Sequence, residues 1–406
     1  MHVCQGEQDR GAAAARRRRC RGAASASSEA TMGCQPSPER PLAEAFVYHE
    51  EDLLLHGVAW QGERSVELAG HAPSHFDQAL QSTWEDRLNR GLFRYRLGVL
   101  PTRILPGDVG FVAQLNIQRG AERRAPQEIH SVQQSFDPQR FGFSQIRPEE
   151  VLFRMAKGCT TPSVPQVGGP GPWAGPAWVL VVINVSPLEF GHVLLVPDPA
   201  LCLPQVLTAE ALAFGLEAVL LSSHPGFRVG FNSLGGFASV NHLHLHGFYL
   251  DWELLAESAP CQPLLPPAGL FLLREFPAPA FLFYSQGGRL EGLARRICQV
   301  TTFLVRKEVA HNLFVTRGAP PEGPARSPAR PGLRILLWAR KACFGAKEEA
   351  AFNVALCELA GHLPVKSAEE FEGLTEASAI HTIQKYLLPE PQFAQLQREL
   401  VALLQE

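Results

Sequence analysis

The sequence has 406 residues, of which 46% are hydrophobic and 19% are charged, and its formal net charge is −3. This length allows two domains or one large duplicated domain. The small net charge argues against a general nucleic-acid binder, which is expected to be strongly basic. The nine cysteines are odd in number and never spaced as Cys-x-x-Cys, so we expect reduced thiols in a cytoplasmic protein. The apolar runs fall short of the about 18 residues that a membrane helix needs, so no membrane partner is expected.

Residues 1–40 are rich in Ala, Arg, Ser and Pro, and include four consecutive arginines at positions 16–19. A segment of this composition has too little apolar surface to form a packed core. We therefore predict a disordered tail over residues 1–40.

The first predicted helix follows this tail. Phe76, Leu80, Trp84 and Leu88 recur at every fourth position, and Ser74 precedes them. This pattern predicts an amphipathic helix with Ser74 as its N-cap. A turn and then a strand are predicted over residues 104–116.

Arginines are frequent after this strand, at positions 119, 123, 124 and 140. They either contact an anionic ligand or form a solvated surface, and the sequence leaves both interpretations open.

An antiparallel α+β unit is predicted next. A Pro/Gly-rich loop over residues 162–176 precedes two strands, 178–185 and 192–196. Thr208 is the expected N-cap of a helix that ends near His224, and another strand begins at Phe227. The order strand, strand, helix, strand, strand is typical of antiparallel α+β folds.

The last strand of this unit contains His242, His244 and His246, which alternate with Leu243 and Leu245. Alternation with a period of two is typical of a strand with one buried face. We therefore expect the leucines to enter the core and the three histidines to line a pocket.

The rest of the chain partly repeats this pattern without the three histidines. A Pro-rich linker, residues 260–267, is followed by a helix over 293–305, strands over 310–318 and 334–340, and helices around 350–360 and over 392–404. We predict one half over residues 41–265 and a degenerate second copy over residues 266–406.

Three histidines at alternate positions of a strand can bind zinc. A catalytic zinc usually has a nearby carboxylate, but the segment from Phe231 to Asn241 contains none, and the nearest downstream acid is Asp251. A structural zinc with a remote Cys and His remains open. A purely structural role for all three is disfavoured, because they lie in register behind Gly235-Gly236.

Nucleophilic catalysis fits the three histidines best. A neutral imidazole can attack phosphorus through Nε2 while a backbone carbonyl holds its Nδ1–H group. The flanking imidazoles can bind phosphate oxygens or transfer a proton to the leaving group. Because a covalent histidine adduct replaces an activated water, this chemistry requires no metal or other cofactor.

Two ordered blocks resemble the signatures of the histidine-triad (HIT) superfamily. His-Leu-His-Leu-His is similar to the triad itself, and residues 184–197, Asn-Val-Ser-Pro-Leu-Glu-Phe-Gly-His followed by an apolar strand and Pro, resemble the upstream block. Asn232, Gly235 and Ser239 resemble the residues just before the triad. These blocks cover residues 178–250.

The wider chain, from about residue 46 to residue 404, resembles the galactose-1-phosphate uridylyltransferase branch of this superfamily. Gly-Phe-Val-Ala-Gln-Leu-Asn at 110–116, Phe-Asp-Pro-Gln-Arg-Phe at 136–141 and Ala-His-Asn-Leu-Phe-Val-Thr-Arg-Gly at 310–318 are similar to the animal GDP-D-glucose phosphorylase family. This family is related to the plant GDP-L-galactose phosphorylases.

The resemblance implies an α+β fold of HIT-like antiparallel sheets with packed helices in tandem duplicated halves. It also implies a cytoplasmic nucleotidyltransferase that uses GDP-glucose and inorganic phosphate and releases GDP and glucose 1-phosphate. The implied purpose is the removal of a GDP-hexose formed by mistake beside GDP-mannose.

The resemblance also implies the roles of individual residues. His244 is the expected nucleophile, which would carry GMP during turnover. The other implied site residues contact the phosphates or the nucleoside or orient the nucleophile: His242, His246, Ser239, Asn232, Asn184 and His192.

Two positions differ from the usual pattern of nucleotidyltransferases in this superfamily, where Gln is frequent. His246 stands two residues after the expected nucleophile, and Ala238 stands six residues before it. The triad alone therefore leaves transfer to phosphate and transfer to water both open. The alternatives are a HIT-type hydrolase of nucleotides and a non-catalytic nucleotide-binding protein.

Overall fold

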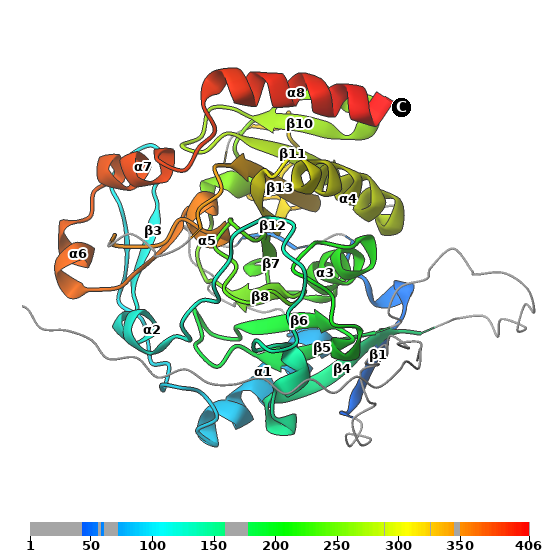
Figure 1. Cartoon of the computed structure of the whole chain (residues 1–406), viewed down its shortest axis with the longest axis vertical. Coiled ribbons are helices and arrows are strands. Elements are labelled where there is room, and N and C mark those ends of the chain that lie inside the picture. The colour runs from blue at the N-terminus through cyan, green and yellow to red at the C-terminus, as the bar shows by residue number, and fades with distance from the viewer. Residues whose placement is uncertain are drawn as a thin grey trace, which may run out of the picture. The chain divides into compact units, whose positions relative to one another are not determined.

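The computed structural model describes residues 43–55, 58–60, 72–158, 178–287, 289–324, 326–344 and 350–405. The predicted tail over 1–40 and the predicted loop over 162–176 lie outside these residues. The described residues form a mixed α+β fold around an eleven-stranded sheet (Figure 1). From one edge to the other the sheet contains β1 (Ala45–Tyr48), β4 (Val151–Lys157), β5 (Trp178–Ile183), β6 (Val193–Pro197), β8 (Leu245–Tyr249), β7 (Phe227–Asn232), β12 (Ala310–Gly318), β13 (Gly332–Arg340), β11 (Ala280–Ser285), β10 (Leu270–Leu273) and β9 (Gln262–Leu265).

Neighbouring strands of this sheet are antiparallel, as predicted, except that β1 pairs with β4 in parallel. A second sheet has the order β14 (His362–Val365), β3 (Val112–Leu115) and β2 (Thr102–Ile104). Its β14–β3 pair is also parallel. The prediction of purely antiparallel sheets is therefore wrong at these two pairs, where the partner strands are far apart in sequence and no hairpin fixes their direction.

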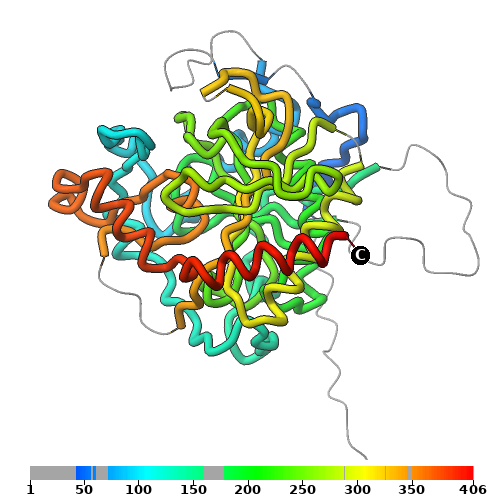
Figure 2. Tube along the Cα trace, turned by 90° about the horizontal axis from the view of Figure 1, so that it is seen from above, coloured from blue at the N-terminus to red at the C-terminus, as the bar shows by residue number. Residues whose placement is uncertain are grey.

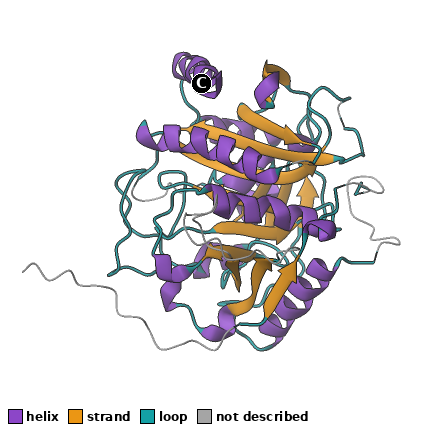
Figure 3. Ribbon diagram, turned by 90° about the vertical axis from the view of Figure 1, so that its right-hand side faces the viewer, coloured by secondary structure: helices purple, strands orange, loops and turns teal. Residues whose placement is uncertain are grey.

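Four long helices cover one face of the large sheet (Figure 3). They are α1 (His75–Asn89), α3 (Ala209–Leu221), α4 (Leu290–Arg306) and α8 (Glu390–Gln405). The C-terminal helix α8, red in Figure 2, packs Phe393 on Phe281 of β11, with ring centroids 5.2 Å apart. The opposite face packs on the small sheet and on three short helices, α5 (Leu356–Ala360), α6 (Ala368–Gly373) and α7 (Glu376–Gln384). A further short helix, α2 (Ile117–Glu122), follows β3 and has no buried residue.

Both predicted helix caps are confirmed. The Ser74 hydroxyl accepts a hydrogen bond from the Asp77 N–H group at the start of α1. The Thr208 hydroxyl accepts one from the Ala211 N–H group at the start of α3. Each bond satisfies one of the backbone donors that a helix leaves free in its first turn.

Two elements differ from the predictions. The predicted linker over residues 260–267 contains strand β9, which includes Pro263. A proline is tolerated there because β9 is an edge strand, where one side of the backbone needs no donor. The helix predicted around 350–360 is shorter, and only Leu356–Ala360 is helical.

The strand order is symmetric about the β7–β12 pair. On one side the order is β7, β8, β6, β5, and on the other it is β12, β13, β11, β10. Each side follows the same chain order, because α3 lies between β6 and β7 in sequence and α4 lies between β11 and β12. This arrangement places the end of β7, and hence the histidine segment, beside the strands of the C-terminal part of the chain.

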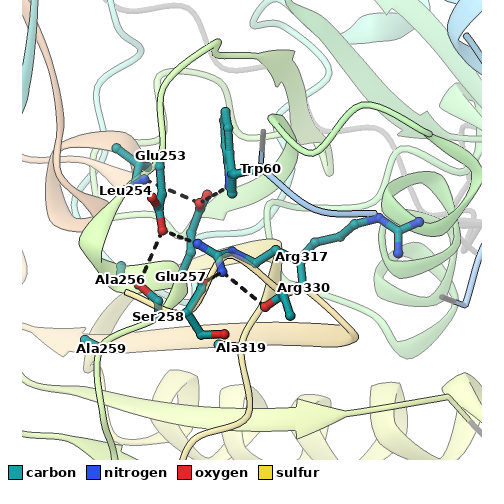
Figure 4. A network of polar contacts seen from close by, with 12 residues as sticks. Trp60, Glu253, Leu254, Ala256, Glu257, Ser258, Ala259, Arg317, Ala319 and Arg330 are labelled. Carbon is teal, nitrogen blue, oxygen red and sulfur yellow. Dashed lines mark hydrogen bonds and ion pairs between the residues drawn. The ribbon is translucent and has the colours of Figure 1, made fainter. Parts of the chain in front are cut away.

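A buried ion pair ties β7 to the loop after β8. Arg228 and Glu257 are both fully buried, and Arg228 Nε lies 2.7 Å from Glu257 Oε1. Trp60 and Thr316 donate further hydrogen bonds to the Glu257 carboxylate, at 3.2 Å and 3.0 Å. Figure 4 shows Trp60 beside the Glu257 carboxylate, and Arg330 beside the neighbouring Glu253, with which it forms an ion pair. The Glu257 carboxylate is therefore held by hydrogen bonds from three separate parts of the chain.

Candidate active site

A cavity of about 790 Å³ lies where the β5–β6 turn, the histidine segment and residues 350–370 meet. Six of the seven site residues expected from the sequence line this cavity, and His242 does not. The six are Asn184, His192, Asn232, Ser239, His244 and His246. Residues from positions 184 to 246 therefore meet at one site.

The histidine segment is less regular than the predicted strand. Strand β8 begins only at Leu245. Its pairing with β6 covers residues 245–247 and does not include His242, Leu243 or His244. The backbone before it is held by other groups: Gln205 Oε1 accepts from the His244 N–H group, and the Leu203 carbonyl accepts from the Leu243 N–H group. The predicted strand is therefore wrong for His242 to His244, whereas the burial of Leu243 and Leu245 in the core is confirmed.

The proton of His244 is fixed by the backbone. Its Nδ1 atom lies 2.7 Å from the carbonyl oxygen of His242. A carbonyl oxygen can only accept, so Nδ1 carries the proton and Nε2 keeps its lone pair. Burial lowers the pKa of His244 to about 4, although the bond to the carbonyl opposes this shift. His244 is therefore a neutral imidazole with a free Nε2 at physiological pH.

His242 is held in the opposite tautomer. Its Nδ1 atom accepts a hydrogen bond of 3.0 Å from the Phe143 N–H group, so its proton is on Nε2. The ring packs between Phe136 and Phe143, with centroid distances of 5.0 Å and 5.4 Å. Burial is the main cause that lowers the pKa of His242 to about 4, and repulsion from the protonated form of His244 adds to the shift. The backbone carbonyl of His242 orients the His244 ring, whereas the His242 side chain does not line the cavity.

His192 and His246 form a hydrogen-bonded pair. The Leu188 N–H group donates to His192 Nδ1 at 2.8 Å, so His192 carries its proton on Nε2. This Nε2 lies 3.1 Å from His246 Nδ1 and donates to it, which leaves the proton of His246 on its own Nε2. Burial is the main cause that lowers the pKa of both rings. The Nε2 atom of His244 is therefore a hydrogen-bond acceptor, and the Nε2–H group of His246 is a donor. The two ring centroids are 5.1 Å apart.

Asn232 connects the site to the C-terminal part of the chain. Its Oδ1 atom accepts from Asn312 Nδ2 at 2.6 Å and from the Leu356 N–H group at 3.1 Å. Its Nδ2 group has no hydrogen-bond partner among the described residues. Asn184 Oδ1 accepts from the Ser186 N–H group, and Asn184 Nδ2 lies 3.2 Å from His192 Nε2.

The sequence did not reveal the apolar end of the cavity or its C-terminal wall. Phe141, Phe143, Val182, Leu194 and Val240 line the apolar end, and they look like ordinary core residues in the sequence. Asn353 and Lys366 also line the cavity, although they lie more than 100 positions after the triad in the sequence. No local pattern marks such residues, because only the pairing of distant strands brings them to the site.

The arginines noted in the sequence divide into two groups. Arg119, Arg123 and Arg124 line the cavity. Arg140 does not, and its exposed guanidinium lies 3.7 Å from Asp137 Oδ2 and 3.8 Å from Glu128 Oε2.

The described residues contain no group of three or more His, Cys, Asp and Glu side chains that could hold a metal ion. In the same part of the chain, no helix has the length and apolar character needed to cross a membrane.

Comparison with known proteins gives matches over most of the chain. The family model "GDPGP1-like, N-terminal domain" matches residues 75–248, and "GDPGP1-like, C-terminal domain" matches residues 268–406. GDP-D-glucose phosphorylase 1 of Homo sapiens is 55% identical over 89% of this chain and 92% of its own length. The Xenopus laevis protein of the same name is 51% identical over 91% and 98%.

More distant relatives are also similar. GDP-L-galactose phosphorylase 1 of Arabidopsis thaliana is 32% identical over 77% of this chain and 70% of its own length. The crystal structure of the yeast Ap4A phosphorylase Apa2 has a TM-score of 0.52 at 13% sequence identity, and covers 78% of this chain and 98% of that chain. This last likeness concerns the fold alone. The two family models and the close relatives show that the chain belongs to the GDP-D-glucose phosphorylase (GDPGP1-like) family.

Proposed function

We propose that this protein is a GDP-D-glucose phosphorylase, which converts GDP-glucose and inorganic phosphate to GDP and glucose 1-phosphate. The observation that carries the proposal is His244, a neutral imidazole whose Nε2 lone pair is kept free by the His242 carbonyl at the wall of a large cavity. Relatives of this name at 51–56% identity support the choice of substrate.

In the first step, His244 Nε2 attacks the α-phosphorus of GDP-glucose. A P–N bond forms while the bond from the α-phosphorus to the bridging oxygen breaks, and the electron pair of that bond leaves with glucose 1-phosphate. The products of this step are the released sugar phosphate and a GMP–histidine adduct. His246, with its proton on Nε2, is the matching donor for the phosphate oxygens.

In the second step, an oxygen of inorganic phosphate attacks the phosphorus of the adduct. The P–N bond breaks, GDP forms, and His244 regains its neutral state with the free Nε2. In this proposal Asn232 and Ser239, which line the cavity, donate hydrogen bonds to the α-phosphate, and Asn184 and His192, which also line it, contact the nucleoside. We further propose that the protein acts in the cytoplasm, where it removes a GDP-hexose that was formed by mistake.

We also propose that residues 41–265 and 266–406 are tandem HIT-like halves. The symmetric strand order about β7–β12 supports this division, since each side combines four strands and one helix in the same chain order. Strand β9 belongs to the first half in sequence, because it ends before residue 266. It nevertheless pairs with β10 of the second half and forms the edge of the sheet there.

The test is phosphate dependence. Purified protein is incubated with GDP-glucose in the presence and absence of inorganic phosphate, and the products are separated. We expect GDP and glucose 1-phosphate that depend on phosphate. GMP formed equally in both samples would indicate a hydrolase instead, and no turnover of any nucleotide would indicate a binding protein.

A further inference from the structure

Three cationic side chains gather at one part of the cavity wall. Arg119 and Arg123 belong to α2 and its C-terminal end, and Lys366 follows β14. The two segments touch, because a Cβ atom placed on Gly120 would lie 3.2 Å from the Cβ atom of Lys366. Arg119 lines the same cavity as His192 and His246, and its charge lowers the pKa of both, after the larger effects of burial and of a neighbouring imidazole.

Among the described residues, no carboxylate oxygen forms an ion pair with any of these three side chains. Lys366 Nζ donates to two neutral acceptors, the Ala350 carbonyl at 2.9 Å and Asn353 Oδ1 at 3.2 Å. The Arg119 guanidinium donates to the Ser186 carbonyl. Arg123 has no hydrogen-bond or ion-pair partner among the described residues. Burial, and then the neighbouring cation, lower the pKa of both Arg123 and Lys366. Cations held together in this way favour binding of an anion such as phosphate.

Three glutamates line the same cavity, and each accepts a hydrogen bond from a group outside the cation cluster. Glu150 Oε1 accepts from Arg147 Nε at 2.8 Å. Glu358 Oε2 accepts from the Ala355 N–H group at 2.9 Å. Glu370 Oε2 accepts from the Ser367 hydroxyl at 2.9 Å. The charge of Glu358 raises the pKa of Arg123 and Lys366, and that of Glu370 raises the pKa of Lys366, but burial and the neighbouring cation outweigh these effects. Counting Arg124, four cations and three carboxylates line the cavity, so a net positive charge faces a ligand.

Ser186 gives an independent indication of a ligand at this point. The residue is 5% exposed, lines the cavity, and its backbone carbonyl accepts from Arg119. Its buried Oγ atom has no hydrogen-bond partner among the described residues. A buried hydroxyl without a partner is unfavourable, and a phosphate oxygen would satisfy it.

Resting on the function proposed above, we propose that Arg119, Arg123, Lys366 and the Ser186 hydroxyl form one phosphate subsite that is used in both steps. It holds the β-phosphate of GDP-glucose while His244 attacks, and then holds inorganic phosphate for attack on the adduct. Displacement at phosphorus is in line, so in each step the attacking and leaving groups lie on opposite sides of the α-phosphorus. Inorganic phosphate therefore attacks from the side on which the β-phosphate left, and one subsite can hold both. Water needs no such subsite, so this cluster determines the preference for phosphate over water.

The test compares Arg123→Gln with the wild-type protein at a phosphate concentration below half-saturation of the wild type. GDP reports transfer of the nucleotide to phosphate, and GMP reports transfer to water. We expect the GDP:GMP ratio to fall at least about tenfold, as expected for the loss of a charge-assisted contact, and Arg123→Lys to restore part of it. Because the ratio is measured within each sample, it does not depend on the amount of folded protein.

Arg140→Gln is the matched control, since it removes an exposed arginine that lies outside the cavity. Its ratio should equal that of the wild type, and an equal fall in both variants would overturn the assignment. An unchanged ratio in Arg123→Gln and in Lys366→Gln would overturn it as well. A failure of the proposed function would be visible separately, because the wild-type protein itself would then form no phosphate-dependent GDP.

Discussion

The carbonyl oxygen of His242 lies 2.7 Å from Nδ1 of His244, so one triad residue fixes the proton of the next. The same reasoning gives His246 the opposite tautomer, because His192 donates to its Nδ1. Two imidazoles on neighbouring positions of one face therefore differ in what they present at Nε2. His244 presents a lone pair and His246 presents a proton, which are the two properties that phosphoryl transfer to a histidine requires.

His244→Ala should abolish turnover, because the other two imidazoles that line the cavity among the described residues, His192 and His246, carry their protons on Nε2. We expect the rate to fall by a factor of about 1000 or more, and no radiolabel from guanine-labelled GDP-glucose to remain on the denatured protein. His224→Ala is the control, since His224 is also buried but lies outside the cavity. Covalent label on the His244 variant would show that the nucleophile is another residue.

The pH dependence of adduct formation should reflect the lowered pKa of His244. A solvent-exposed imidazole loses its nucleophilic lone pair as the pH falls through about 6.5. Since the pKa of His244 is about 4, the neutral form persists above that value and is lost only as the pH falls through it. The single-turnover rate should therefore stay constant from pH 8 to pH 6.

Acid unfolding must be separated from this effect. His242, His244 and His311 all have a pKa of about 4 in the folded state. Between about pH 6.5 and pH 4 the unfolded chain binds more protons, so stability falls as the pH falls, by up to about 1.4 kcal/mol per pH unit for each histidine. Circular dichroism at each pH identifies the range in which the protein stays folded. A rate that halves near pH 6.5 in folded protein would contradict the prediction.

His246→Gln should keep transfer to phosphate. His246 presents an N–H donor at Nε2, and the side-chain amide of Gln presents an N–H donor as well, so the hydrogen bond to the phosphate oxygens can still form. We expect transfer to phosphate to fall less than about tenfold. The measurement is GDP formed per minute, with GMP formed per minute as the measure of hydrolysis. An equal loss of both products would assign His246 to the step that the two reactions share.

The sequence predicted the parts of the fold and site that depend on local patterns. Ser74 and Thr208 were identifiable as caps because the required hydroxyl immediately precedes an amphipathic segment. Leu243 and Leu245 were identifiable as core residues because they alternate with histidines. The regular strand expected around His242 did not form, since side chains from elsewhere, such as Gln205, replace a neighbouring strand as hydrogen-bond partners.

The parts that depend on distant pairing were not predictable in this way. Lys366 reaches Gly120 of α2 only because β14 pairs with β3 in parallel, and nothing in either strand specifies that partner. Asn232 meets Asn312 only because β7 pairs with β12. The unpaired hydroxyl of Ser186 is likewise a property of the folded cavity, because burial and the lack of a partner have no local sequence pattern.

Arg228→Met should destabilise the fold strongly without touching the cavity. The variant leaves Glu257 buried without its cationic partner, and the hydrogen bonds from Trp60 and Thr316 do not supply a compensating charge. We expect a loss of about 3–5 kcal/mol in the free energy of unfolding, measured with denaturant. Arg274→Met is the control, because the Arg274–Glu390 pair is at the surface and should contribute less than about 1 kcal/mol. If both variants lose the same small amount, the Arg228–Glu257 pair is not a determinant of stability, and the packing of β7 and β12 alone holds this part of the sheet.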